Sequence, residues 1–158
     1  MSDLPIDSKQ QWYSGGLRFT CTSCGNCCTG PPGAVWVTIE ETKAMASKLG
    51  VQADVFLRTH VRRIGSRLSL TEQLTEYGHD CVFLDRQSIP GKAICGVYEA
   101  RPVQCRTWPF WPENLLDRQA SDQARHDTPC PGMGHGRHHS AEQILVQLTR
   151  SIQSEDSA

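Results

Sequence analysis

Residues 21–28 read Cys-Thr-Ser-Cys-Gly-Asn-Cys-Cys, so four cysteines fall within eight positions. A thiolate is a soft, anionic ligand, and a spacing of two residues lets a tight turn direct both sulfurs at one ion. Gly25 and Asn26 are residue types that tolerate the left-handed backbone of such a turn. Nearby hydroxyl and backbone N–H groups can donate to the sulfurs and spread their charge. The segment is therefore predicted to bind metal.

The other cysteines are far apart in the sequence, so only tertiary contact could bring them to the first four. Eight thiols could fill two four-thiolate sites, or one cluster plus a second ion or a redox pair. Adjacent side chains diverge, so we expect Cys27 and Cys28 to face two centres, or only one of them to ligate. The candidate metal ligands are Cys21, Cys24, Cys27, Cys28, Cys81, Cys95, Cys105 and Cys130.

The order of these motifs is similar to that of a known family. CxxCxxCC at residues 21–28 is followed by Cys81-Val-Phe-Leu and by Cys95-Gly-Val-Tyr-Glu-Ala-Arg-Pro-Val-Gln-Cys105-Arg. Over residues 17–136 this set resembles the YkgJ-like cysteine-cluster family, described as zinc- or iron-chelating and related to the metal domain of flagellin lysine methylase. The resemblance implies a metal-chelating domain and, for the methylase branch, an iron–sulfur cluster. It supplies no substrate.

Spacing alone does not separate zinc from iron, because both accept four thiolates in a tetrahedral array. The opening C-x2-C-x2-C is similar to the bacterial ferredoxin run, although the Cys-Pro pair expected three residues later is missing. This partial run, a predicted helix terminus near Cys105 and the methylase branch favour an iron–sulfur cluster over zinc.

Length and charge narrow the class of protein. A chain of 158 residues should form one domain with a modest core. A formal net charge of −1 argues against a general nucleic-acid binder. No apolar run reaches membrane-spanning length and no signal peptide is visible, so we expect no membrane association and a cytoplasmic location. Disulfides are rare there, which leaves metal ligation as the expected use of the thiols.

Sequence patterns predict an α+β fold, a small single domain with short strands and several helices around the metal centre. We expect a flexible N-terminal arm at residues 1–16, the metal-binding domain at 17–153 and a frayed C-terminus at 154–158. The predicted strands cover residues 17–21, 34–37, 67–71, 81–84 and 93–98, of which the last two would form a hairpin carrying Cys81 and Cys95. The predicted helices cover 38–49, about 54–64, a short segment from about 101 that contains Cys105, part of 113–127, and a segment that begins at Ser140.

Three groups of side chains near the cysteines are open to more than one interpretation. Arg101 and Arg106 could add positive charge beside anionic sulfurs or form ordinary surface salt bridges. The Trp108-Pro-Phe-Trp-Pro112 segment could seal a cluster from water, dock a protein partner or simply pack in the core. Three histidines follow a flexible Gly-Met-Gly segment, and we expect them in an exposed polar loop rather than as ligands: His135, His138 and His139.

Three functions fit the sequence. The first is a metal-binding or interaction module whose metal supports the fold. The second is an iron–sulfur enzyme of methyl- or electron-transfer type, although no Gly-rich nucleotide loop and no Ser/His/Asp or Cys/His set can be named. The third is metal storage or trafficking through labile thiols. Whether the protein is an enzyme is left open.

Overall fold

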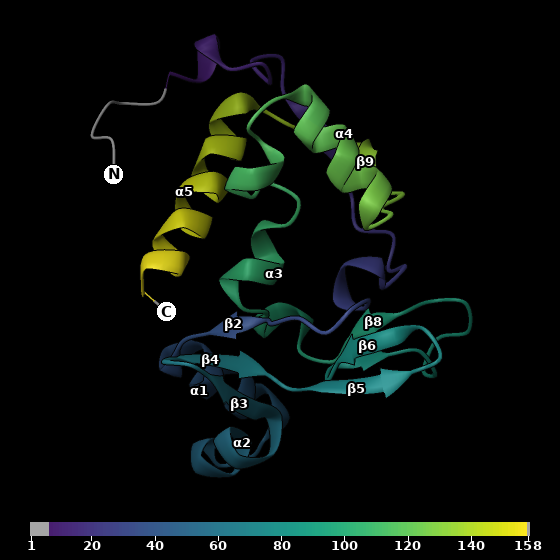
Figure 1. The fold of residues 1–158 in the computed structure, drawn as a ribbon, viewed down its shortest axis with the longest axis vertical. Helices are drawn as coiled ribbons and strands as arrows, with labels where there is room; N and C mark the ends of the chain where they lie inside the picture. Colours follow the sequence, from purple (N-terminus) through teal and green to yellow (C-terminus); the bar gives the residue numbers. More distant parts are fainter. Residues whose placement is uncertain (1–6, 158) are drawn as a thin grey trace.

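The computed structural model describes residues 7–157 and confirms the α+β class. Two groups of elements lie on either side of the short helix α3, Val103–Thr107 (Figure 1). One group contains an antiparallel sheet in the order β2-β4-β3, with helices α1 and α2 beside it. Its elements are β2 (Trp36–Val37), α1 (Ile39–Leu49), α2 (Ala53–His60), β3 (Val61–Ile64) and β4 (Arg67–Leu70).

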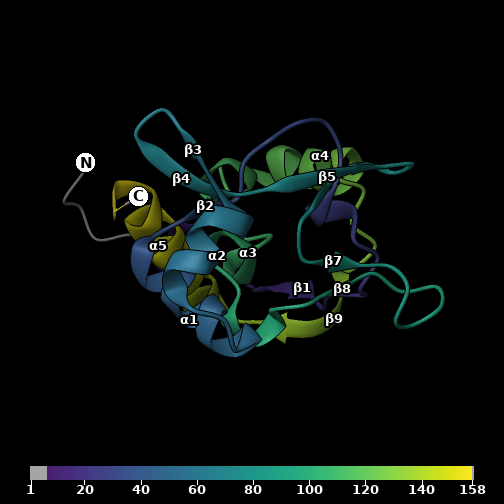
Figure 2. The same cartoon turned by 90° about the horizontal axis from the view of Figure 1, so that it is seen from below.

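The other group contains the antiparallel pair β1-β9 and the longest helix, α5. Its elements are η1 (Ser8–Gln10), β1 (Leu17–Phe19), η4 (Pro112–Asn114), α4 (Arg118–Asp127), β9 (Met133–His139) and α5 (Ala141–Ser157). A third region holds two hairpins and two short 3-10 helices: η2 (Asn26–Cys28), β5 (Glu72–Thr75), β6 (Gly78–Cys81), β7 (Leu84–Asp85), β8 (Ile94–Cys95) and η3 (Tyr98–Ala100). The exposed loop between β7 and β8 projects away from the rest of the molecule (Figure 2).

Helix α1 follows its local sequence signals closely. The Thr38 hydroxyl accepts a hydrogen bond from the Glu41 amide at 3.1 Å, and Glu41 Oε1 accepts one from the Thr38 amide at 2.9 Å. This capping box satisfies two of the free amides at the start of the helix. The helix ends at Gly50, whose φ of 70° is the left-handed conformation that glycine favours. Sequence alone predicts both ends, because Thr38-Ile39-Glu40-Glu41 fits a capping box and Gly50 is a favoured residue after a helix, and the structure confirms both.

The helix predicted for residues 54–64 is wrong in its last turn. Helix α2 ends at His60, and Val61–Ile64 forms strand β3, which pairs with β4 over Val61–Leu70 to Ile64–Arg67. A two-residue turn with Gly65 at a φ of 62° joins the strands. The ladder of tertiary hydrogen bonds therefore overrides the helical pattern at the β-branched ends of this segment.

Two other sequence predictions need correction. Residues 133–139, predicted to form a loop, form strand β9, which pairs with β1 through Leu17–His139 and Arg18–His138. The hairpin expected to carry Cys81 and Cys95 is divided, because Cys81 ends β6 while Cys95 lies in β8, opposite Leu84. Glycines with positive φ at 78, 134 and 136 allow the turns and bulges that produce this arrangement.

Two hydrophobic clusters anchor the two groups of elements. The first is centred on Met45, Phe56 and Val97, which are almost completely buried. The second joins Tyr13 to Phe110, from the predicted aromatic segment, and to Ile144 of α5. Because each group has its own core, α3 and the cysteine-bearing loops are held from both sides.

Two predictions concern the ends of the chain, and both remain predictions. The predicted flexible arm at residues 1–16 and frayed end at 154–158 fall partly on residues 1–6 and 158, which lie outside the described residues. Across residues 7–157, none of the helices is both long enough and apolar enough to cross a membrane.

Candidate metal centre

The cysteine-rich segment forms two consecutive turns in which backbone amides face sulfur. The Ser23 amide donates to Cys21 Sγ, and the Asn26 amide donates to Cys24 Sγ, each at 3.4 Å. Such N–H···S bonds offset negative charge on a thiolate. The left-handed positions are Ser23, with φ 57°, and Gly25, with φ 80°.

Of the two residue types that tolerate a left-handed backbone, Gly25 adopts it and Asn26 does not. Asn26 instead begins η2, and its side-chain amide donates to the Pro129 carbonyl at 2.7 Å. This bond ties the cysteine-rich segment to the loop that carries Cys130. The sequence drew attention to Asn26 for its backbone conformation, but in the structure its contribution is this side-chain hydrogen bond.

The loop that leads into β8 holds the other side of the cysteine-rich segment. The Ala93 amide donates to the Ser23 carbonyl at 2.7 Å, and Lys92 Nζ donates to the Thr22 carbonyl at 3.3 Å. These contacts fix the turns against the hairpin that supplies Cys95.

A cavity of about 340 Å³ lies where these segments meet α3. Six of the eight cysteines line it, and we call this space the thiol cavity. The six come from five segments: Cys21 before the turns, Cys27 and Cys28 from η2, Cys81 from β6, Cys95 from β8 and Cys105 from α3. The rest of the wall is largely apolar and includes Leu70, Phe83, Val97, Trp108 and Trp111.

Two predicted ligands, Cys24 and Cys130, do not line the thiol cavity. Cys24 is half-buried, with its sulfur accepting from Asn26, and Cys130 is buried. Sequence offers no signal that separates these two cysteines from the other six.

Cys27 and Cys28 do not diverge as expected, since both line the thiol cavity with their sulfurs 3.8 Å apart. Thiolates bound tetrahedrally to one zinc at about 2.3 Å have sulfurs about 3.8 Å apart. The 3-10 conformation of η2 therefore gives the adjacent pair a spacing that suits a shared centre.

Burial keeps most of the cavity thiols protonated in the absence of a cation. It raises the pKa of Cys81 to about 11, and it also raises the pKa of Cys95 and of Cys105. A hydrogen bond from Cys28 lowers the pKa of Cys27 to about 7, and Cys28, as the buried donor, has a raised pKa. A bound metal ion would reverse this balance, because coordinated thiols lose their protons.

One cation faces the sulfurs. Arg101 lines the thiol cavity, and its charge lowers the pKa values of Cys27, Cys95 and Cys105 against the larger effect of burial on the last two. Its guanidinium stacks 3.9 Å from the Tyr98 ring centre, and Nε donates to the Tyr98 carbonyl at 2.9 Å. Arg106 is exposed and does not line this cavity, so only one of the two predicted arginines faces the site.

Helix α3 is positioned by Glu41 and Gln104, through tertiary contacts that the sequence did not predict. Glu41 Oε2 accepts from the Val103 amide at 2.6 Å, while its other oxygen caps α1. Gln104 accepts from the Trp36 amide at 2.9 Å and donates to the Ala34 carbonyl at 3.1 Å. The capping box predicts one oxygen of Glu41, but no local pattern predicts where the second one goes.

The two tryptophans beside the cavity differ in how their N–H groups are satisfied. Trp111 Nε1 donates to the Gln104 carbonyl at 2.9 Å and to Thr107 Oγ1 at 3.1 Å. Trp108 Nε1 is buried and has no hydrogen-bond partner within residues 7–157. The two rings meet edge to face at 4.8 Å and line the thiol cavity, whereas Phe110 of the same segment packs in the second hydrophobic cluster.

The histidines of β9 do not reach the thiol cavity. His138 and His139 pair through Nε2 with the carbonyls of Gly15 and Phe19, at 2.8 and 3.0 Å, and His135 Nε2 lies 3.3 Å from Arg125 Nη2. The prediction that they lie apart from the cysteine ligands agrees with this placement, although they stand on a strand.

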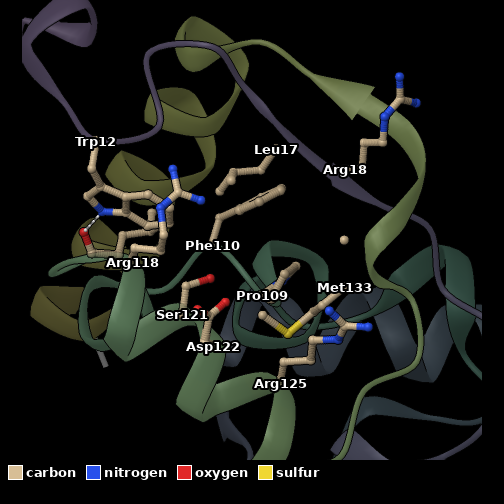
Figure 3. A pocket seen from close by; sticks show the side chains of 12 residues that line it. Trp12, Leu17, Arg18, Pro109, Phe110, Arg118, Ser121, Asp122, Arg125 and Met133 are labelled. Carbon is tan, nitrogen blue, oxygen red and sulfur yellow. Dashed lines mark hydrogen bonds between the residues drawn. The ribbon is translucent and has the colours of Figure 1, made fainter.

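A smaller cavity of about 140 Å³ lies between α4 and the β1-β9 pair (Figure 3). Arg118 lies over the Trp12 ring, 5.2 Å from its centre, and Asp122 stands between Arg118 and Arg125 on the same helix. The charges there are of both signs, and the cavity lining contains no cysteine. It is therefore separate from the candidate metal centre.

The donor set of the thiol cavity suits a thiophilic metal, although the side chains do not surround a single point. Nowhere in residues 7–157 do three His, Cys, Asp or Glu side chains already form a closed ligand group. The cysteines instead stand around the wall of a space with room between them. Six thiols and the guanidinium of Arg101 line this space, a donor set of the kind that binds zinc or iron.

Comparison with known proteins agrees with this geometry. Residues 20–131, which include all the cysteines but none of α5, match the model of the CxxCxxCC family, a "putative zinc- or iron-chelating domain". The chain belongs to the CxxCxxCC family. Metal chelation through the cysteine cluster is thus supported at the level of the family, and the choice between zinc and iron is not.

One curated relative of this CxxCxxCC protein is the uncharacterized protein MJ0661 of Methanocaldococcus jannaschii. It is 31% identical over 98 residues, which are 62% of this chain and 48% of the relative. The chain thus spans about half the length of that relative. No solved structure matches the chain.

Proposed function

We propose that this CxxCxxCC protein holds an iron–sulfur centre in the thiol cavity. One observation carries the proposal: six cysteines from five segments line a single, largely apolar cavity of about 340 Å³. Free structural cysteines pack among apolar neighbours, but they have no reason to gather around one space. Mutual contact among thiolates is costly unless a cation compensates their charge.

The size of the cavity supports a cluster rather than a single zinc ion. Its volume is many times the roughly 30 Å³ that one water molecule occupies in the liquid. A closed zinc site holds four sulfurs about 2.3 Å from the ion and leaves no interior space. A cluster of several iron and sulfide ions occupies more volume and accepts hydrogen bonds at its sulfurs.

We assign the following roles to the residues that line the thiol cavity. Cys27, Cys28, Cys81, Cys95 and Cys105 hold the centre, and Cys21 stands at the exposed edge as a sixth donor. Arg101 offsets the negative charge of the thiolates, and the Trp108 N–H donates to sulfur. When bound, an iron–sulfur centre would supply one-electron redox chemistry.

The placement of the thiols bears on the two alternative functions, which are metal storage or trafficking and an iron–sulfur enzyme. Metal trafficking requires ligands that exchange at the surface, whereas Cys105 and Cys81 are half-buried in a cavity with a largely apolar lining. This favours a resident centre over cargo. A methyl- or electron-transfer enzyme stays an alternative, and S-adenosylmethionine binding measured on the loaded protein would test it.

The cellular setting follows from the same thiols. All eight cysteines are free, which suits a reducing compartment, so we place the protein in the cytoplasm. With a net charge of −1 we assign it no general affinity for nucleic acid or membrane. A protein partner for electron exchange fits the exposed edge at Cys21 and Cys27.

Metal analysis of cysteine variants tests the proposal. Protein purified without oxygen should be brown and contain iron and acid-labile sulfide in similar amounts. Cys105→Ser and Cys28→Ser should lose most of the metal, whereas the matched Cys130→Ser and Cys24→Ser, outside the cavity, should retain it. Colourless protein with zinc alone would refute the cluster, and equal loss in all four variants would refute the assigned ligands.

A further inference from the structure

Helix α4 turns charged rather than apolar side chains toward the β1-β9 pair. The helix contributes no buried residue and belongs to neither hydrophobic cluster. Three of its charged side chains instead line the cavity of about 140 Å³ that separates it from the strands: Arg118, Asp122 and Arg125. They are three or four positions apart and therefore lie on one face of the helix. A helix face that meets a cavity through charges, and not through packing, suits a polar ligand.

The charges on this face do not pair with one another. Opposite charges at these spacings commonly form ion pairs on a helix. None of the ion pairs found within residues 7–157, however, includes Arg118, Asp122 or Arg125. The carboxylate and the two guanidinium groups that flank it are therefore available to a ligand.

Both guanidinium groups extend from α4 to other walls of the cavity. Arg118 lies over the Trp12 ring, 5.2 Å from its centre, and Trp12 lines the cavity. Arg125 Nη1 would lie 3.3 Å from a Cβ atom on Gly134, which is also a lining residue. Figure 3 shows the Asp122 carboxylate between the two arginines. The two cations thus stand at two sides of the space, with the anion between them.

A dissolved molecule can reach these charges. Arg118, Asp122 and Arg125 are all exposed at the surface. Arg18 also lines the cavity, but its guanidinium points away in Figure 3 and its Nη1 donates to the Gly136 carbonyl at 2.9 Å. The ligand therefore meets two positive groups and one negative group.

Apolar side chains form much of the remaining wall. Phe110, Leu115 and Met133 are buried and line the cavity together with the Trp12 ring. The cavity volume is several times the roughly 30 Å³ that one water molecule occupies in the liquid. A short hydrocarbon chain therefore fits beside the charged groups.

The charges of both signs select the class of ligand. A purely anionic molecule would be repelled by Asp122, and a purely cationic one by the two guanidinium groups. We propose that this cavity binds a small amino acid with an apolar side chain. Its carboxylate pairs with Arg118 and Arg125, its ammonium group pairs with Asp122, and its side chain contacts the apolar wall.

Amino-acid binding at this position is independent of the metal centre. The cavity lining contains no cysteine, and none of its residues lines the thiol cavity. Loss of metal and loss of amino-acid binding can therefore be observed separately, on the same protein.

Three probes of similar shape test the proposal on the full-length protein at pH 7. They are L-valine, isovalerate, which lacks the amino group, and isobutylamine, which lacks the carboxylate. Each is added at equal ionic strength, and binding is followed by NMR through the signal of the Trp12 indole N–H. L-valine should shift this signal saturably, and each analogue should bind at least about fivefold more weakly because one ionic contact is lost.

Exposed variants locate the site. Asp122→Asn should weaken L-valine binding about fivefold and should strengthen isovalerate binding, because the same carboxylate attracts the ammonium group and repels the acid. Arg118→Gln should weaken the binding of both probes. The matched control is Asp127→Asn, the same change on an exposed residue of α4 that does not line the cavity, and it should leave both affinities unchanged.

The proposal fails on any of three results. The first is the absence of a saturable response to L-valine. The second is an analogue that binds as tightly as L-valine, which would mean that one of the two charges is not recognised. The third is an Asp122→Asn variant that changes both affinities in the same direction or changes neither, since opposite effects on the two probes cannot arise from altered folding.

Discussion

A Cβ atom on Gly25 would lie 2.6 Å from the Cβ of Ala93, so the cysteine-rich segment and the loop before β8 meet at closer than ordinary side-chain contact. This approach allows the Ala93 amide to reach the Ser23 carbonyl. The glycine thus determines how near the first cysteines come to Cys95. Its φ of 80° adds a second reason for having no side chain there.

Gly25→Ala should lower the free energy of unfolding by about 2–4 kcal/mol, from backbone strain and steric overlap together. Gly91→Ala is the matched control, since Gly91 has a similar φ of 76° but nothing within 4 Å of an added Cβ. The control should cost about 1 kcal/mol, the strain alone. Urea unfolding measures both, and equal losses would contradict the role of close approach.

Glu41→Gln should destabilise the protein by about 1–3 kcal/mol, because its carboxylate accepts from two backbone amides and an amide side chain cannot replace both. Since one of these amides begins α3, metal retention should fall as well. Thr38→Ala, which removes only the cap of α1, should cost about 1 kcal/mol and leave the metal content unchanged. Unfolding curves and metal analysis of both variants are the measurements. If Glu41→Gln retained its metal just as Thr38→Ala does, the link between Glu41 and α3 would be contradicted.

The Asp80–Arg86 pair should make stability depend on acid. The Arg86 fork holds the pKa of Asp80 below its usual range, so the stabilisation is complete above the unfolded value of about 3.9 and is lost as the pH falls through the folded pKa. Asp80→Asn should cost about 3 kcal/mol at pH 7, since it removes the charge of a buried partner.

Unfolding of the wild type and Asp80→Asn by urea between pH 7 and pH 3 provides the measurement. The difference between them should stay constant down to about pH 4 and then shrink. A difference that persists undiminished at pH 3 would show that the carboxylate is not the source of the stability.

Trp108→Phe and Trp111→Phe should differ in the metal-free protein. The Trp108 N–H has no acceptor to lose, so its removal should change the unfolding free energy by less than about 1 kcal/mol. Removing the Trp111 N–H breaks bonds to Gln104 and Thr107 and should cost about 1–2 kcal/mol. Equal costs in thermal or urea unfolding would imply that Trp108 has a partner after all.

The features that the sequence predicted correctly are mostly those that depend on neighbouring residues. Capping at Thr38 and Glu41, the glycine stop at Gly50 and the turn at Gly25 depend on neighbouring residues, so the pattern was sufficient. The strand at Val61–Ile64 was missed because its conformation depends on pairing with β4, which no local pattern encodes.

The candidate site shows the same division. The gathering of Cys81, Cys95 and Cys105 beside the first motif was expected from their chemistry, and the structure brings them to one cavity. The exclusion of Cys24 and Cys130 was not expected, because thiols look alike in sequence and only tertiary packing sorts them. The cavity beside Arg118 and Asp122 was equally hidden, since charges on a polar helix look like a solvated face until the neighbours of that helix are known.

The two separate cores on either side of α3 have a kinetic consequence. Three cysteines of the thiol cavity lie in the one segment 21–28, but Cys81, Cys95 and Cys105 reach that segment only through long-range contacts. Cys81 and Cys95 pack against the first core, so condensation of that core brings two of the cavity thiols into place before a metal centre is acquired. Metal delivery would then act on a nearly finished cavity whose exposed entrance is at Cys21 and Cys27.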